Sequence, residues 1–151
     1  MLYLPHFEAG AGMQQFPTIG IISRRDNHEL IDTLVALTTF LKERADTTVI
    51  LDEAVSTLLG THSFKVCARS AMGKRCQLVI VVGGDGSMLK AASTMADLGI
   101  PVVGVNRGRL GFLTDILPEE LEQGLNPILA GQYKKEERFL LEVSIPSGAS
   151  E

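Results

Sequence analysis

The sequence contains no tryptophan, and aromatic residues make up only 5% of it. It also lacks long hydrophobic runs: the longest uninterrupted apolar stretch covers residues 78–82. Because a membrane span needs roughly 20 apolar residues, we expect no transmembrane helix. Residues 1–15 have neither a basic start nor an apolar segment, so we expect a flexible leader there and no secretion signal. With 45% apolar and 21% charged residues, the composition predicts a soluble globular protein of one domain.

The sequence also contains only two cysteines and carries more acidic than basic residues. Cys67 and Cys76 are the only cysteines, and no paired histidines stand at metal-site spacing, so we expect neither a disulfide framework nor a zinc site. We interpret both cysteines as reduced thiols of a cytoplasmic protein. The net charge is −4, which argues against binding to nucleic acid or to a membrane surface, because either would need a basic face.

What the sequence does contain is an alternation of apolar, β-branched runs with amphipathic segments. Strands are expected at residues 18–23, 47–51, 77–82 and 100–106. Helices are expected at residues 28–45 and 87–98, and after Pro118, where Gly124 and Pro127 should weaken, bend or break the helix. This order predicts an α/β fold with a mostly parallel sheet flanked by helices on both faces. Ligands of such sheets bind beyond the carboxyl ends of the strands.

Some local features can also be predicted. Asp26, followed by Glu29, resembles a capping box for the first helix, whose leucine stripe should lie in the core. The polar stretch 52–75 contains a short helix around 54–59 and is otherwise expected to be a mobile surface excursion. In the helix over 87–98, the residues expected to face the sheet are Leu89, Ala92, Met95 and Ala96.

A glycine-rich loop, "VVGGDGSMLK", follows the third expected strand. Gly83, Gly84 and Gly86 let the backbone approach a ligand closely. The free amides at the start of the next helix favour an anion such as a nucleotide phosphate. Lys90 lies one turn into that helix and leans toward its start, so its ammonium can reach the same anion.

Asp85 is unexpected in this loop, because a carboxylate repels phosphate unless it has another task. It can carry Mg²⁺ to the phosphates or accept a proton from an attacking hydroxyl, and both tasks indicate phosphoryl transfer. The structural alternative is that Asp85 only caps the following helix and the glycines only turn the chain. The pattern G-x-x-x-x-G-K-[ST] of a P-loop and the pattern G-x-G-x-x-G of a Rossmann dehydrogenase are both missing.

A second loop, "GVNRGRLGFLTD", follows the next expected strand. Its glycines again permit close backbone approach. Arg107 and Arg109 are candidate phosphate contacts, and Phe112 can pack against a base or a sugar. Taken singly, each has a structural alternative, as a solvated arginine or a core phenylalanine.

Together, "GGDGSMLKAA" and "IPVVGVNRGRLGFLTD" closely resemble the NAD kinase family, and the resemblance covers residues 16–144. GGDG alone is shared with diacylglycerol, sphingosine and phosphofructo-kinase relatives. The resemblance implies an enzyme that transfers the γ-phosphoryl group of ATP to the adenosine-ribose 2'-hydroxyl of NAD, giving NADP. It implies ATP and NAD as substrates, Mg²⁺ as the divalent metal, and a cytoplasmic protein that forms a homo-oligomer when full length.

The resemblance also implies roles for single residues. Asp85 is the catalytic residue, as proton acceptor or metal-assisting carboxylate, and no definite metal ligand is identified. Gly83 and Gly84 shape the loop near the ATP phosphates. The positions that match NAD-contacting residues are Asp85, Gly86, Lys90 and Phe112.

The expected α/β nucleotide-binding domain covers residues 16–136. Residues 137–151, with a strand at 137–146, are expected to begin a second, β-rich domain that is missing from this chain. In NAD kinases that domain carries an Asn-Glu or Asn-Asp pair and further nucleotide contacts, so we expect the 151-residue chain alone to be inactive or weak. The alternative functions are a non-catalytic nucleotide-binding module and, disfavoured by the second loop, a lipid kinase that shares GGDG.

Overall fold

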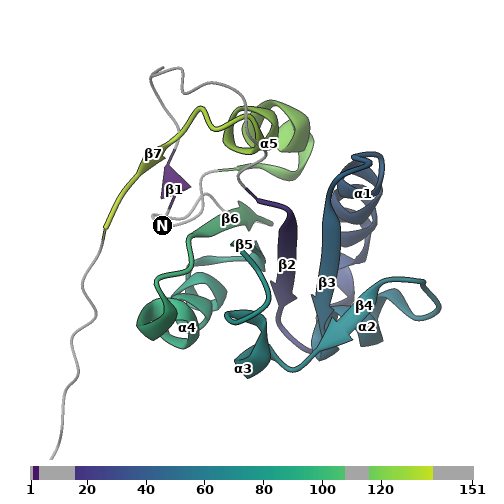
Figure 1. Ribbon diagram of the computed structural model, residues 1–151. Coiled ribbons are helices and arrows are strands. Elements are labelled where there is room, and N and C mark those ends of the chain that lie inside the picture. Colours follow the sequence, from purple (N-terminus) through teal and green to yellow (C-terminus); the bar gives the residue numbers. More distant parts are fainter. Residues whose placement is uncertain (1, 4–15, 108–115, 138–151) are drawn as a thin grey trace, which may run out of the picture.

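The structure is a computed structural model that describes residues 2–3, 16–107 and 116–137. Its centre is a five-stranded sheet in which every pair of neighbouring strands is parallel, in the order β4-β3-β2-β5-β6 (Figure 1). The strands are β2 (Thr18–Ser23), β3 (Thr48–Asp52), β4 (Lys65–Cys67), β5 (Leu78–Gly83) and β6 (Val102–Asn106). The predicted α/β fold with a mostly parallel sheet is confirmed.

Helices cover both faces of this sheet (Figure 1). The hydrophobic core on one face includes residues of α1 (Ile31–Lys42), α2 (Glu53–Leu59) and α5 (Leu121–Leu129). The core on the other face includes residues of α3 (Arg69–Met72) and α4 (Asp85–Met95). All six residues of β5 are buried, because this strand is covered on both sides.

Short elements complete the fold. Three 3-10 turns lie next to longer helices: η1 (His28–Leu30) before α1, η2 (Ala96–Leu98) after α4, and η3 (Pro118–Glu120) before α5. A separate antiparallel pair joins β1 (Leu2–Tyr3) to β7 (Lys134–Lys135). The expected leucine stripe of the first helix is confirmed as core, and its members are Leu30, Leu34, Leu37 and Leu41.

The predicted capping box is wrong by one residue. Asp26 lies in the turn before η1 with a φ of 60°, and Asn27 occupies the N-cap position. The Asn27 side chain accepts a hydrogen bond of 3.2 Å from the Glu29 amide. Asparagine competes equally with aspartate for this position, so the turn geometry decides which of the two neighbours caps the helix.

The stretch expected to be a mobile excursion contributes to the sheet instead. The helix expected around 54–59 is confirmed as α2, but β4 then pairs in parallel with β3 at the edge of the sheet. After β4, α3 places the buried Met72 against Gly20, where an added Cβ would lie 2.5 Å from the methionine sulfur. β4 has only three residues, with Lys65 and Val66 exposed, so it leaves no apolar pattern in the sequence.

The face predicted for the helix over 87–98 is confirmed for Met95 but wrong for Leu89 and Ala96. Met88, Ala91 and Met95 are buried against the sheet, whereas Leu89 is 51% exposed and Ala96 is exposed. Two apolar stripes, one residue apart, run along this segment, so periodicity alone cannot choose between them. The start of α4 at Asp85 fixes the rotation of the helix and turns Ser87 inward.

The helix that follows Pro118 is continuous through both residues that were expected to disturb it. Pro118 lies in the first turn of η3, and α5 runs on through Gly124 and Pro127. An added Cβ at Gly124 would lie 2.8 to 3.0 Å from three side-chain carbons of Ile116. This glycine therefore lets α5 pack closely against Ile116.

Candidate functional site

The two glycine-rich loops begin side by side at the carboxyl edge of the sheet. β5 and β6 are paired up to their last residues, Gly83 opposite Asn106. The Arg107 amide then donates a hydrogen bond of 3.2 Å to the Gly83 carbonyl. The sequence prediction that both loops line this edge is confirmed for the residues that the structure describes.

Gly83 is a glycine that the fold itself requires. Its φ is 155°, a conformation that L side chains rarely adopt. An added Cβ would lie 2.7 Å from Ser87 Oγ and 2.9 Å from Ser87 Cβ. Gly83 thus allows the start of α4 to fold tightly against the end of β5.

Neither Gly84 nor Gly86 is required to be glycine by a positive φ or by a close contact. Neither has a positive φ, and a Cβ added at either position would meet no described atom within 4 Å. Gly84 holds the N-cap position, where glycine is favoured over alanine. Gly86 lies in the first turn of α4, where glycine costs conformational entropy that alanine would not. The open space in front of this backbone is therefore what close approach of a ligand requires.

Asp85 is the first residue of α4, and the N-cap position belongs to Gly84, which makes no side-chain cap hydrogen bond. Asp85 therefore lies one residue after the N-cap position. A carboxylate in the first turn still interacts favourably with the positive end of the helix dipole. Asp85 thus lies at the end of the loop that joins β5 to α4.

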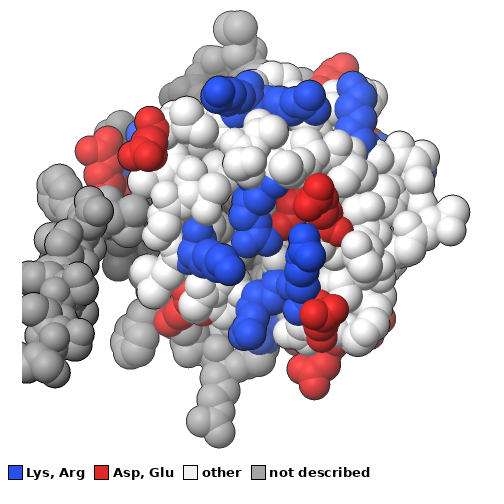
Figure 2. Space-filling model, turned by 90° about the horizontal axis from the view of Figure 1, so that it is seen from below, with Lys and Arg blue, Asp and Glu red and all other residues white. Residues whose placement is uncertain are grey.

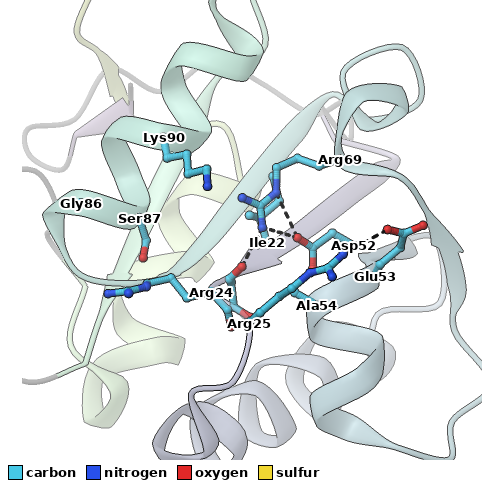
Figure 3. A pocket seen from close by; sticks show the side chains of 11 residues that line it. Ile22, Arg24, Arg25, Asp52, Glu53, Ala54, Arg69, Gly86, Ser87 and Lys90 are labelled. Carbon is cyan, nitrogen blue, oxygen red and sulfur yellow. Dashed lines mark hydrogen bonds and ion pairs between the residues drawn. The ribbon is translucent and has the colours of Figure 1, made fainter.

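A pocket of about 550 Å³ opens beside this loop (Figure 3). One wall comes from the start of α4, with Gly86, Ser87 and Lys90. The opposite wall comes from the ends of β2 and β3, the start of α2 and α3. In Figure 3 the side chains of Ser87 and Lys90 point from α4 into the pocket. The residues on the opposite wall are Ile22, Ser23, Arg24, Arg25, Asp52, Glu53, Ala54 and Arg69.

A buried carboxylate, Asp52, organises that opposite wall. Its Oδ1 accepts a hydrogen bond of 2.8 Å from the Val55 amide and so caps α2. Its Oδ2 pairs with Arg69, whose Nε lies 3.1 Å away. Arg69 Nη2 also donates to the Ser23 carbonyl at 2.7 Å. This network joins the ends of β2 and β3 to α3. Within it, the charges of Asp52 and Arg69 neutralise each other.

The other cations of the pocket are less engaged. Arg25 forms an exposed ion pair of 3.6 Å with Glu53. Arg24 and Lys90 are exposed, and neither has an ion pair with an acid in the described parts of the chain. Figure 2 shows Lys and Arg side chains gathered around a hollow on the face of the molecule toward which β2 points. The pocket therefore offers two positive charges to an anion.

Ser87 adds an unusual polar group to the same pocket. The residue is 8% exposed, and its Oγ is a buried polar atom with no hydrogen-bond partner among the residues described. Buried hydroxyl groups are nearly always hydrogen-bonded, because leaving one without a partner costs free energy. An unpartnered hydroxyl that lines a pocket indicates a partner that comes from outside the chain.

The structure brings together only some of the predicted site residues. Gly86 and Lys90 line the pocket, and Asp85 lies next to them on α4 without being part of the lining. The Arg107 guanidinium is instead directed to Thr33 of α1, with 3.4 Å between Nη1 and Oγ1. The predictions for Arg109 and Phe112 fall outside the described residues.

Sequence reasoning missed Arg24, Ser87 and the Asp52–Arg69 pair. Arg24 follows the first strand directly, so the rule that ligands bind at the carboxyl edge could have identified it. Ser87 stands next to the loop motif but carries no signal of burial. Asp52 and Arg69 are 17 positions apart, and only the pairing of β4 with β3 brings them together.

The two cysteines carry no sign of reactivity. Both thiols are free; burial raises the pKa of Cys76 to about 12, with a smaller contribution from the neighbouring Cys67, and burial also raises the pKa of Cys67. In residues 2–3, 16–107 and 116–137, no three His, Cys, Asp or Glu side chains gather as a metal site. Within the same ranges, no helix has both the length and the apolar character needed to cross a membrane.

Comparison with known proteins agrees with these motifs. A family model described as the ATP-NAD kinase N-terminal domain matches residues 19–133. An NAD kinase of Azotobacter vinelandii is 49% identical over 133 residues, which are 88% of this chain and 45% of that protein. An NAD kinase of Pseudomonas aeruginosa (strain PAO1) is 47% identical over 136 residues, which are 90% of this chain and 46% of that protein.

A solved structure shares the fold. The crystal structure of yeast NADH kinase complexed with NADH matches with a TM-score of 0.65 at 19% identity, over 75% of this chain and 38% of that one. The chain spans less than half the length of the curated relatives it matches. On the family model and these relatives, the chain belongs to the NAD kinase family and carries its N-terminal domain.

Proposed function

We propose that this chain supplies one part of a site that transfers the γ-phosphoryl group of ATP to the 2'-hydroxyl of NAD. The observation that carries the proposal is the meeting of the GGDG loop with the start of the second loop at one sheet edge, beside a pocket with two available cations. Positioning and charge stabilisation are the main requirements of phosphoryl transfer.

Asp85 accepts the proton of the NAD 2'-hydroxyl in this proposal. The hydroxyl oxygen forms a bond to the γ-phosphorus while the bond from that phosphorus to the β–γ bridging oxygen breaks, and ADP leaves. Asp85 is adjacent to Gly86, whose open backbone face lets a substrate come near. The Asp85 carboxylate also lies at the N-terminus of α4, where the positive end of the helix dipole stabilises its negative charge.

The remaining predicted roles stay proposals. Gly86, Lys90 and Phe112 contact NAD, and Gly83 and Gly84 shape the loop near the ATP phosphates. Lys90 is the best supported of these, because it lines the pocket from α4. Arg107 and Arg109 are the weakest, since the Arg107 guanidinium is directed to Thr33.

Mg²⁺ is the divalent metal of the proposal. Asp52 and Glu53 line the pocket, but Asp52 is engaged by Arg69 and the Val55 amide, and Glu53 by Arg25. Asp85 is the carboxylate of the GGDG loop, and a metal-assisting role there is the alternative to its role as proton acceptor. One or two carboxylates suffice for Mg²⁺, because it takes its other ligands from water and phosphates. The bound ion supplies positive charge to the phosphate oxygens.

The assembly around this site is also proposed. Residues 16–136 form the nucleotide-binding domain, and residues 137–151 begin a β-rich domain whose further part completes the site. The full-length protein is a cytoplasmic homo-oligomer.

A hybrid enzyme tests the function. Residues 1–136 would be joined to the part of the Azotobacter vinelandii NAD kinase that the chain does not match, and NADP formation from ATP and NAD would be followed. We expect turnover by the hybrid and little or none by the 151-residue chain. A folded hybrid that forms no NADP would contradict the function, and robust turnover by the chain alone would exclude a non-catalytic nucleotide-binding module.

A further inference from the structure

The end of β2 is held by an arginine that comes from a distant helix. Arg69 of α3 donates from Nη2 to the Ser23 carbonyl at 2.7 Å, and its Nε and Nη2 both donate to Asp52 Oδ2. Figure 3 shows the Arg69 side chain reaching toward Asp52. Ser23 is the last residue of β2, so this contact fixes the backbone directly before Arg24.

The turn that follows β2, residues 24–27, leads from the strand to η1 and is held at both ends. Arg24, its first residue, lines the pocket. At its other end, Asn27 caps η1 with its side chain. Between them, Asp26 has a φ of 60° and is the one non-glycine residue with a positive φ in the parts of the chain that the structure describes. Such a conformation persists only where the surrounding structure fixes it.

We propose that Asp52 and Arg69 are positioning residues for phosphoryl transfer: they hold the 24–27 turn so that Arg24 stays at the pocket that takes the donor. The inference rests on the proposed function only for the identity of the donor as ATP. Neither residue touches the donor, and both act through the backbone of Ser23. Side chains that contact a substrate need such support, because small displacements of the backbone cost binding and rate.

Stability alone does not account for this charged pair. The Asp52 side chain is 3% exposed and that of Arg69 is 26% exposed. Taking charges out of water costs free energy that their attraction often only offsets, so an apolar pair of similar volume would stabilise the fold at least as well. Met72 is the buried residue of α3, so this short helix adds little else to the core. What Arg69 supplies, and an apolar residue could not, is a directed hydrogen bond to a carbonyl beside the pocket.

Trypsin cleavage reports directly on the turn, which offers cleavage sites after Arg24 and Arg25. The decisive variant is Arg69→Lys, which keeps the positive charge beside Asp52 but lacks the planar fork that binds a carboxylate and a carbonyl together. We expect cleavage of the folded variant after Arg24 and Arg25 to be about tenfold faster, because local opening exposes the turn. Cleavage after Lys42, at the exposed end of α1, should be unchanged.

The hybrid enzyme gives the second readout. In it, Arg69→Lys should raise the KM for ATP about tenfold and leave kcat within about twofold, because a looser turn weakens donor binding without touching the reacting atoms. Asp52→Asn should act similarly, and the double variant should do no more than the stronger single one, because the two residues act as a unit. The matched control is Arg44→Gln, which removes an arginine that bonds Asn126 of α5 outside the pocket.

The proposal is overturned by unchanged cleavage after Arg24 and Arg25 in Arg69→Lys, by an unchanged KM for ATP, or by equal effects of Arg44→Gln. Urea unfolding identifies a variant that is cleaved through global unfolding, in which cleavage after Lys42 would rise as well; that result would also contradict a positioning role. If the hybrid forms no NADP, the proposed function fails, and the cleavage measurement still decides whether Arg69 holds the turn.

Discussion

Among single residues, the glycines of the GGDG loop differ in what they do. Gly83 is required by its φ of 155° and by its contact with Ser87, whereas Gly86 has an ordinary φ and open space before it. The first is therefore a requirement of folding and the second a requirement of ligand approach. The sequence alone cannot distinguish the roles of these two glycines, because the difference lies in their dihedral angles and in their distances to other residues.

Paired alanine variants separate these two requirements. Gly83→Ala should destabilise the chain by about 1–3 kcal/mol, because alanine is strained at this φ and would clash with Ser87. Gly86→Ala should leave stability unchanged or raise it by about 0.5–1 kcal/mol, because alanine favours the helix, while weakening the binding of inorganic triphosphate, which stands in for the ATP phosphates. Urea unfolding and calorimetry measure the two effects. Loss of stability in Gly86→Ala with unchanged binding would reverse the assignment.

The cysteines give a prediction for pH. Burial raises the pKa of Cys76 from its ordinary value of 9.0 to about 12. The folded chain then holds this proton more tightly than the unfolded chain, so the stability it contributes is complete below about pH 9 and is lost as the pH rises toward 12. Urea unfolding should show this decline, and Cys76→Ala should reduce it. An identical pH profile in that variant would show that other groups cause the decline.

Among the elements, those with strong apolar patterns were predicted well. β2, β5 and α1 were predicted because buried strands and amphipathic helices leave clear periodicities. β4 could not be predicted, because a three-residue edge strand is defined by its partner β3 and not by its own residues. The inward face of α4 was missed because two apolar stripes compete, and its N-terminal turn decides between them.

The junction of β3 with α2 depends on Asp52, which caps α2 and holds Arg69. Asp52→Asn keeps an oxygen that can accept the cap hydrogen bond but removes the charge that pairs with Arg69. Because the Arg69 side chain is 26% exposed and water can still solvate it, the expected loss of stability is about 1–3 kcal/mol. Asp52→Ala removes the cap as well and should cost about 1 kcal/mol more. Chemical denaturation measures both, and equal stabilities for all three proteins would contradict the network.

At the scale of the whole molecule, the site could be predicted only in part. The GGDG loop was found because its chemistry is contiguous in sequence, and the structure places Asp85 one residue after the N-cap of α4. The opposite wall combines Arg24, Asp52 and Arg69, which come from three separate segments. Arg24 follows a predicted strand directly, but Asp52 and Arg69 meet only after β3 and β4 have paired, so no local pattern indicates their contact.

The chain spans less than half the length of its relatives, so the central claim concerns what its part contributes: Asp85 as the proton acceptor. The most direct test compares NADP formation by the hybrid enzyme with and without Asp85→Asn, a change that keeps the side-chain shape and removes the charge. Loss of a general base lowers turnover by about 10²–10⁴-fold, and we expect a loss in this range with triphosphate binding retained. Near-normal turnover by the folded Asp85→Asn hybrid would contradict the account.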